Sequence, residues 1–372
     1  MPKDGRQVLE RLRAVAFDPE ARELRNLHTR LAAAPGNVHL ALELARHYIE
    51  RSRADADPRY LGRAQAALTH WWDDPQPPVA VLVLRATIKQ SQHDFTNALA
   101  DLDRALQSDP ANAQARLTRA TILTVLGRYA EARRACLPLA RLAPGLVAIT
   151  AAASVTSLTG EAERSCALLE KALDESASAP TSEKLWALGL LAETSARLDR
   201  AAEAEQFYRR AIALGQRDSY LLGAYADFLL DQGRAQDAAS LLQGETRADG
   251  LLLRLALAEK SLAPRPPGFD AHVASLGERF EASRLRGDRV HQREEARFTL
   301  HLLGRPQSAL LLAQQNWDVQ HEPSDARILL EAALATQARA AAQPVFDFIQ
   351  TNHLEDARLA RLASQITGQA AR

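Results

Sequence analysis

Residues 79–110 read VAVLVLRATIKQSQHDFTNALADLDRALQSDP, and residues 113–144 read AQARLTRATILTVLGRYAEARRACLPLARLAP. The two stretches align without a gap at an offset of 34 residues. Both contain Arg-Ala-Thr early, an aromatic residue later (Phe95, Tyr129) and a proline at the end (Pro110, Pro144). A repeat of this length, rich in Ala and Leu, indicates a helical hairpin that stacks on copies of itself.

The residues at fixed offsets suit such a hairpin. Small residues let two antiparallel helices approach closely, a glycine in the turn takes positive φ, and a proline cannot continue a helix. This pattern resembles the tetratricopeptide-repeat family, whose positions are filled here by Ala86, His93, Phe95, Ala98 and Pro110, and then by Ala120, Gly127, Tyr129, Ala132 and Pro144. The resemblance implies an all-α, right-handed solenoid of helical hairpins with helical caps at both ends.

The pattern continues beyond these two units in a weaker form. Within residues 35–246 we expect six units, at about 38–75, 79–112, 113–145, 146–180, 185–218 and 219–246. Residues 1–34 are expected to form N-terminal capping helices, 247–288 a degenerate helical pair, 289–353 two further repeat-like pairs, and 354–372 a C-terminal capping helix and tail. No linker is long enough to separate domains, so these parts should form one continuous superhelix.

Composition excludes several classes of function. The chain has 46 Lys plus Arg and 46 Asp plus Glu, and this zero net charge argues against a nucleic-acid binder, which needs a basic face. No apolar run is long enough to predict direct insertion in a membrane. The start of the chain does not resemble a signal peptide, although a processed exported protein would look the same. Cys136 and Cys166 either form one bridge or, as we favour, are two small buried residues.

No catalytic motif is present. The sequence lacks GxSxG, a P-loop, HExxH and GxGxxG, so we expect no enzyme activity and no cofactor. His39 and His47 are two helical turns apart, about 12 Å at 1.5 Å per residue, which is too far to share a metal ion. We therefore expect no metal site.

The resemblance implies that the first helix of each hairpin lines a concave groove. The early units contribute a neutral, hydroxyl-rich lining of Thr87, Gln90, Gln114, Thr121, Thr124, Thr150 and Ser154. Later units contribute an aromatic and acidic lining of Trp186, Glu193, Arg197, Tyr220, Asp227 and Asp231. We expect backbone amides of a bound peptide to pair with the hydroxyl groups, and a basic or apolar side chain to meet the aromatic stretch. The alternative is a merely solvated inner surface.

A second candidate site is a polar cluster near the C-terminus. Its members are Arg293, Glu294, Arg297, Asn316, Trp317, Asp325, Arg327 and Glu331. Arg297 occupies an offset where the repeat has a small residue, and a buried arginine needs a carboxylate partner. We predict that it pairs with Glu331, Asp325 or Glu294, with Trp317 nearby. The cluster is either a polar lock that stiffens this end, which we favour, or a ligand pocket.

The function expected from these observations is a non-catalytic scaffold or adaptor that binds a protein or peptide partner. Residues 221–234 (LLGAYADFLLDQGR) and 316–334 (NWDVQHEPSDARILLEAAL) also resemble a set of uncharacterised, usually exported proteobacterial tetratricopeptide proteins. That resemblance implies a periplasmic location, with a cytoplasmic one as the alternative, but no biochemical activity. The leading hypothesis is that the scaffold supports assembly of an envelope or membrane-protein complex. The rival function is a small-ligand or metal-delivery protein that uses the 290–331 cluster, and it would need an enclosed polar pocket.

Overall fold

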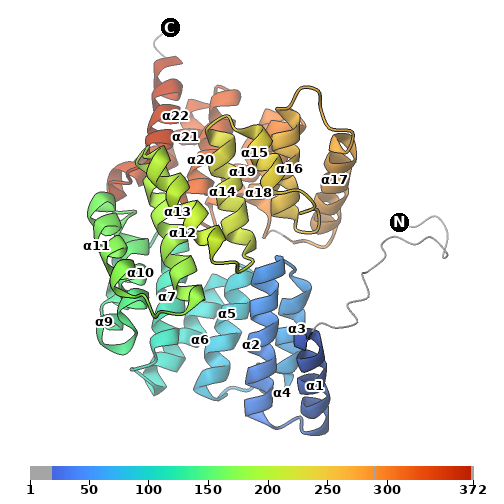
Figure 1. Ribbon diagram of the computed structural model, residues 1–372, viewed down its shortest axis with the longest axis vertical. Coiled ribbons are helices and arrows are strands. Elements are labelled where there is room, and N and C mark those ends of the chain that lie inside the picture. Colours follow the sequence, from blue (N-terminus) through green and yellow to red (C-terminus); the bar gives the residue numbers. More distant parts are fainter. Residues whose placement is uncertain (1–18, 289, 370–372) are drawn as a thin grey trace, which may run out of the picture.

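The computed structural model describes residues 19–288 and 290–369, and within them every regular element is a helix. The first described element is α1 (Pro19–Ala33). The remainder of the predicted N-terminal cap and the last residues of the predicted tail lie outside the described residues. The all-α solenoid predicted from the sequence is confirmed (Figure 1).

The helices follow one another as antiparallel pairs. The first pairs are α2 (Val38–Asp55) with α3 (Arg59–Ala67) and α4 (Thr69–Trp72), α5 (Val79–Ser91) with α6 (Phe95–Ser108), α7 (Ala113–Val125) with α8 (Tyr129–Cys136) and α9 (Leu139–Leu142), and α10 (Gly145–Thr156) with α11 (Ala162–Glu175). The next are α12 (Thr181–Arg197) with α13 (Ala201–Ala213), α14 (Ser219–Asp231) with α15 (Ala235–Leu241), and α16 (Asp249–Lys260) with α17 (Phe269–Leu285). The last are α18 (Gln292–Arg297) and the π-helical segment η1 (Phe298–Leu302) with α19 (Pro306–Trp317), then α20 (Pro323–Ala335) with α21 (Arg339–Asn352), and finally α22 (Ala357–Gln369).

Local sequence explains where these hairpins turn and how closely they pack. Most turns between paired helices hold a residue with positive φ, namely His93, Gly127, Gly160, Asp199, Gly233, Gly304 and Gln337. Asp94, Asn112 and Asp218 cap the following helices through side-chain oxygens that accept backbone N–H groups. The small residues of the repeat, such as Ala86 and Ala98, are fully buried at the helix crossings.

One helix pair is joined by a buried ion pair. The Arg85 guanidinium on α5 donates to both carboxylate oxygens of Asp101 on α6, at 2.8 and 2.6 Å. Lys89 Nζ donates to the same carboxylate at 2.8 Å. Arg85 and Asp101 are only 5% and 3% exposed. Arg85 is therefore part of the core of its unit, whereas Arg119, the arginine of the second Arg-Ala-Thr, is 24% exposed at its side chain and pairs with Asp103.

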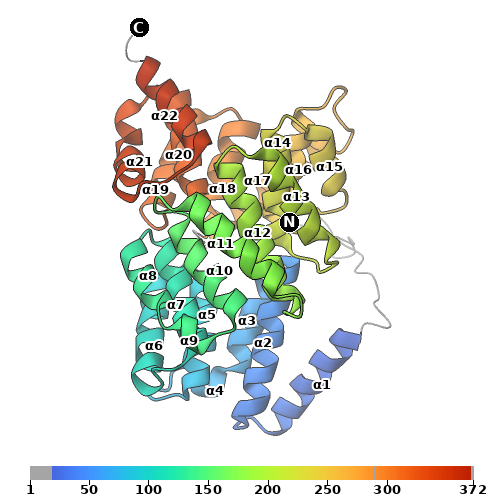
Figure 2. The same ribbon diagram turned by 60° about the vertical axis from the view of Figure 1, so that its left-hand side comes forward.

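The solenoid completes a turn, and its C-terminal helices lie against its middle. Figure 2 shows α19 and α21 above α8. The backbone N–H of His321 donates to the carbonyl of Val125 at 2.8 Å, and the Phe348 ring lies 5.7 Å from the Tyr129 ring. One apolar core cluster accordingly combines residues of α7–α10 with residues of α18–α22. The turn between α7 and α8 is thus covered by C-terminal residues of the chain itself.

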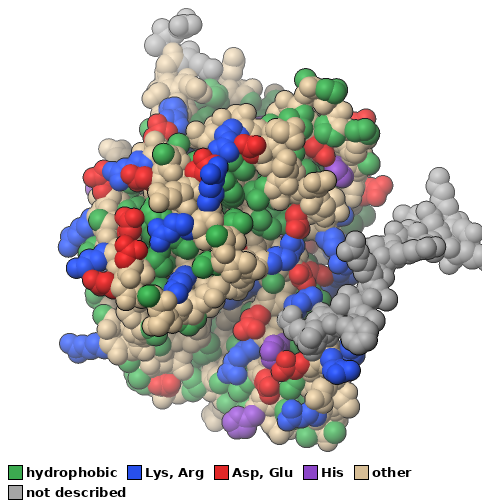
Figure 3. All heavy atoms as spheres, viewed as in Figure 1, with side chains coloured by type: hydrophobic (Ala, Val, Ile, Leu, Met, Phe, Trp, Pro, Cys, Tyr) green, Lys and Arg blue, Asp and Glu red, His purple; other side chains and the backbone are tan. Residues whose placement is uncertain are grey.

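The outer face in view carries both signs of charge. Basic and acidic side chains are interspersed over it, without a large patch of one sign (Figure 3). Among the described helices, none combines the length and the hydropathy that crossing a bilayer requires.

Candidate functional site

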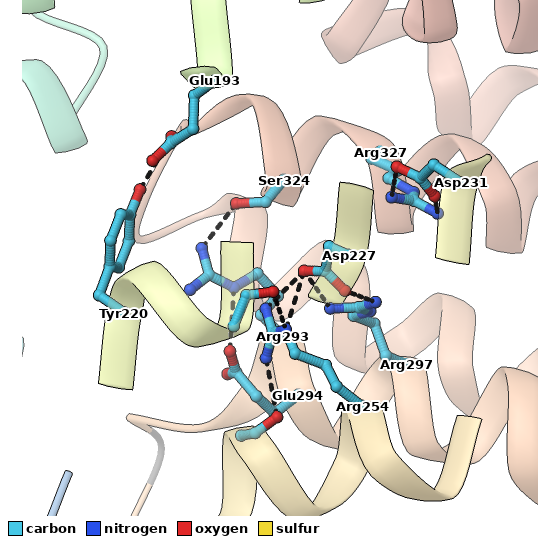
Figure 4. Close-up of polar contacts among 12 residues, drawn as sticks. Glu193, Tyr220, Asp227, Asp231, Arg254, Arg293, Glu294, Arg297, Ser324 and Arg327 are labelled. Atoms are coloured by element: carbon cyan, nitrogen blue, oxygen red, sulfur yellow. Dashed lines mark hydrogen bonds and ion pairs between the residues drawn. The ribbon is translucent and has the colours of Figure 1, made fainter. Parts of the chain in front are cut away.

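The first helices of successive hairpins face the inside of the superhelix, and α14 lies at the centre of a polar network there. Asp227 on α14 accepts from Arg254 on α16, with Oδ2 2.9 Å from Nε and 2.7 Å from Nη2. It also accepts from Arg297 on α18 at 2.7 and 3.2 Å (Figure 4). Burial alone would raise the pKa of Asp227, but Arg254 and Arg297 hold it well below its usual range. One carboxylate therefore joins three hairpins.

Asp231, one helical turn further along α14, makes a second junction. Arg327 on α20 donates to it at 3.1 and 3.2 Å, and Arg358 on α22 also pairs with it. Arg327 additionally donates to Glu331 at 2.6 Å, and the His301 imidazole lies 2.8 Å from the same carboxylate. Burial would raise the pKa of Glu331, yet the His301 contact and Arg327 lower it to about 2.

Arg293 on α18 forms a third junction, with the start of α20. Its guanidinium donates to Glu294 at 3.2 Å, to Glu322 at 2.7 Å and to Ser324 at 2.7 Å. Arg293 and Arg254 lower the pKa of Glu294 to about 2 against the effect of burial. The three junctions together connect α14, α16, α18, α20 and α22.

Asp325 is fully buried at the N-terminus of α20, where its side chain helps to cap the helix. Its Oδ2 accepts the backbone N–H of Glu322 at 2.8 Å, which forms a reciprocal capping box. Its Oδ1 accepts from Asn316 at 2.8 Å, with Arg293 at 3.3 Å. Burial raises the pKa of Asp325, and Arg293 opposes that rise. Asn316, predicted as a cluster member, therefore helps to cap a helix.

The predicted partner of Arg297 was wrong. Arg297 is buried and paired with a carboxylate, as expected, but the partner is Asp227 rather than Glu331, Asp325 or Glu294. Asp227 lies 70 positions earlier in the sequence, on the first helix of another hairpin, so the pairing joins units that are not neighbours in the chain. Trp317 packs its ring with those of His321 and Phe348. The guanidinium groups of this cluster are bonded to carboxylates, which is the arrangement of a polar lock.

The predicted hydroxyl-rich lining is only partly accessible, and its use by a peptide stays a prediction. Thr87 and Thr150 are buried, and their hydroxyls donate to the carbonyls of Val83 and Leu146 in their own helices. The hydroxyls of Thr121, Thr124 and Ser154 likewise donate to carbonyls three or four residues earlier. A threonine or serine in a helix can donate its hydroxyl hydrogen to a carbonyl of its own helix in this way, without any contact from a partner protein. Of the two glutamines, Gln114 is exposed and Gln90 is half-buried.

Four members of the predicted aromatic and acidic lining already contact other parts of the chain. Asp227 and Asp231 are occupied by arginines of the chain, so neither is available to a basic side chain of a partner. Trp186 is half-buried against the core cluster that includes the C-terminal helices. Arg197 donates to the carbonyl and hydroxyl oxygens of Ser157 at 3.2 and 3.1 Å.

Tyr220 remains exposed, with the half-buried Glu193 beside it. The Tyr220 hydroxyl donates to Glu193 at 3.0 Å, and Tyr220 is 67% exposed. Burial raises the pKa of Glu193 to about 7, because its surroundings disfavour the charged form more than Tyr220 and Arg197 favour it. Figure 4 shows this pair near the network, with Glu193 on α12 and Tyr220 on α14. Two adjacent inner helices therefore present an aromatic ring and a carboxyl group that titrates near neutral pH.

Sequence reasoning missed several members of the network. Arg254 is the lone arginine of the apolar stretch LLLRLALA (251–258), and that isolation is a signal of a buried pair. Arg358 and His301 gave no comparable signal.

Glu23, Glu43 and His47 bring possible metal-ligating atoms within 4.8 Å of one another on α1 and α2, but both carboxylates are exposed. Cys136 and Cys166 are both free.

Comparison with known proteins gave one family match and several solved structures. The tetratricopeptide-repeat family matches residues 90–152. Solved structures with similar folds include a tetratricopeptide repeat protein from Parabacteroides merdae, 17% identical over 77% of this chain and 98% of that chain, with a TM-score of 0.37. Others are the APC/C hetero-tetramer Cut9–Hcn1 (12% identity, 96% and 91% coverage, TM-score 0.43) and IFIT1 with Gppp-AAAA (14%, 96% and 88%, TM-score 0.44). No curated protein matched the sequence. The family match covers residues 90–152, and helical hairpins continue on both sides of that segment.

Proposed function

We propose that this chain is a non-catalytic scaffold that binds a segment of a protein partner on its inner surface beside Tyr220. The observation that carries the proposal is the 67% exposure of Tyr220 on α14, the same helix on which Asp227 and Asp231 are already paired with arginines of the chain. Exposed aromatic residues beside polar groups are enriched at protein interfaces. The arginine network holds α14 rigidly, so the ring is presented at little cost in conformational entropy.

The chemistry of this position limits what can bind. Glu193 is near its midpoint of titration at neutral pH, so it acts as a hydrogen-bond acceptor or donor more than as a fixed charge. A suitable segment carries an apolar or aromatic side chain to cover Tyr220 and a donor that reaches Glu193. Asp227 and Asp231 add no attraction for a cationic segment, because arginines of the chain already pair with both carboxylates.

A site-specific photo-crosslinker tests this proposal. Introduced in place of Tyr220, it should give a discrete crosslinked product in cells of the source organism. A crosslinker in place of Leu168, which is 52% exposed on α11, is the matched control and should not give that product. Tyr220→Ala should then weaken binding of the purified crosslinked protein by at least tenfold. No product from position 220, or the same products from both positions, would contradict the proposal.

We also propose that the partner belongs to an envelope or membrane-protein complex in the periplasm. This finer proposal rests on the resemblance of residues 221–234 and 316–334 to exported proteins. Fractionation of source cells that express the native gene tests it. Recovery of the protein with cytoplasmic markers, together with a soluble cytoplasmic partner, would contradict the location while leaving the scaffold function intact.

A further inference from the structure

A pocket lies at the N-terminal end of the solenoid, away from the inner network. It has a volume of about 350 Å³ and is formed by α1, α2 and α3. Each helix contributes residues spaced as on one helical face, for example Tyr48 and Arg51 from α2, and Tyr60 and Arg63 from α3. Figure 2 shows α1 diverging from α2 toward the N-terminal end of α1. The volume is in the range of small-ligand pockets, roughly 300–1,000 Å³.

The inner wall of the pocket is apolar and aromatic. Tyr48 is 8% exposed, and its ring stacks with that of Tyr60 at a centroid distance of 6.1 Å and an interplanar angle of 24°. Leu24 on α1 packs against the same N-terminal core cluster. A planar or apolar group can therefore lie against a preformed surface.

The rim of the pocket is basic. Three arginines line it, Arg25, Arg51 and Arg63, and no carboxylate is among the residues that line it. Arg51 is held by Asp55 at 3.1 Å, and the Arg63 guanidinium lies 5.2 Å from the centre of the Tyr60 ring. In a chain with equal numbers of acidic and basic residues, this excess of positive charge is local.

We propose that this pocket binds an anionic group, a carboxylate or a phosphate, carried on an aromatic or apolar body. Guanidinium groups bind such anions through paired N–H donors, and they do so best where a neighbouring surface excludes water. Arg25 and Arg63, from opposite helices, would hold the anion, and Tyr48 and Tyr60 would contact the body. The anion is supplied either by an acidic aromatic segment of a protein or by a free aromatic acid.

Binding of phenyl phosphate to the full chain, measured by isothermal titration calorimetry, tests the site. Arg25→Gln combined with Arg63→Gln should weaken binding at least tenfold, and Tyr60→Leu should remove the preference for phenyl phosphate over inorganic phosphate. The control combines Arg134→Gln with Arg164→Gln, which makes the same change in net charge at exposed positions and should leave binding unchanged. Unaltered binding in the pocket variant, or equal losses in the pocket and control variants, would overturn the proposal.

Two further ligands identify the source of the anion. A short peptide with alternating glutamate and tyrosine should bind at least tenfold more tightly than phenyl phosphate if the natural ligand is a protein segment. Benzoate and phenyl phosphate should bind as well as the peptide if it is a free acid. Because the inner surface takes no part, a failure here leaves the Tyr220 proposal standing, and the Tyr220→Ala variant should bind phenyl phosphate normally.

Discussion

Removal of the Asp227 carboxylate should destabilise the C-terminal half of the solenoid. Arg254 and Arg297 are 15% and 11% exposed at their side chains, and both donate to this one carboxylate. Asp227→Ala leaves two neighbouring guanidinium groups without this carboxylate. Breaking a buried pair by removing one partner costs about 3–5 kcal/mol. Because Asp227 itself is 22% exposed and water can reach the gap, we expect the lower end, about 3 kcal/mol.

Two measurements check this value. Urea unfolding at pH 7 gives the total change, and hydrogen exchange should show the loss of protection in α14, α16 and α18, because repeat arrays need not unfold as one unit. Glu131→Ala is the control, since its pair with Arg128 is 33% and 46% exposed and should contribute less than about 1 kcal/mol. Adding Arg297→Met to Asp227→Ala should recover part of the loss, because an apolar residue needs no partner.

The same carboxylate should determine part of the acid sensitivity. The pKa of Asp227 is depressed in the folded state, so its contribution is present above its unfolded pKa of about 3.9 and is lost as the pH falls through the folded value. Asp227→Ala should therefore flatten the fall in stability below about pH 4. A loss at pH 7 no larger than that of Glu131→Ala would refute the reasoning.

Three other perturbations give separate tests. The pKa of Glu193 measured by carbon-detected NMR should be about 7. Because this pKa is raised above its unfolded value, the protein should lose stability as the pH rises from about 4.5 to 7, and Glu193→Gln should remove that loss. An ordinary pKa near 4 would contradict this prediction. Gly127→Ala should lower the melting temperature more than Gly233→Ala, because both positions have positive φ but only at Gly127 would the new Cβ lie 2.7 Å from the Phe348 ring; equal shifts would mean that this close approach is absent. Asp101→Asn should cost about 3 kcal/mol in urea unfolding, because it weakens the buried ion pair of α5 and α6; a loss below about 1 kcal/mol would contradict that burial.

The local features of the hairpins could be predicted from the sequence because they depend on neighbours in the chain. Gly127 takes positive φ in its turn and Tyr129 begins α8, as the repeat pattern indicates. The pairing of Arg297 could not be predicted, because Asp227 is 70 positions away in sequence and their approach depends on the pitch of the whole superhelix. The π-helical segment that begins directly after Arg297 is equally invisible to a 34-residue pattern.

The sequence predicted which residues belong to the candidate site, but not which of them are available to a partner. Tyr220 and Glu193 were named from their offsets, and the structure brings them together. Asp227 was expected to face a partner, yet an arginine seven residues into the next unit, in an otherwise apolar helix, already neutralises it. The position of a residue in the repeat indicates whether its side chain faces the inside of the superhelix. Ion pairs across the inside then decide whether that side chain is available to a partner.

Contact between the two turns of the solenoid also fixes the number of its repeats. The carboxylate of Glu355 accepts the backbone N–H of Ala162, and the carbonyl of His321 faces the Tyr129 hydroxyl, across separations of 193 and 192 positions. An open array can gain or lose a unit in its middle and keep all its interfaces. Here, one unit more or fewer between α8 and α19 would shift every such pair out of phase, so a change in the number of repeats would cost these contacts.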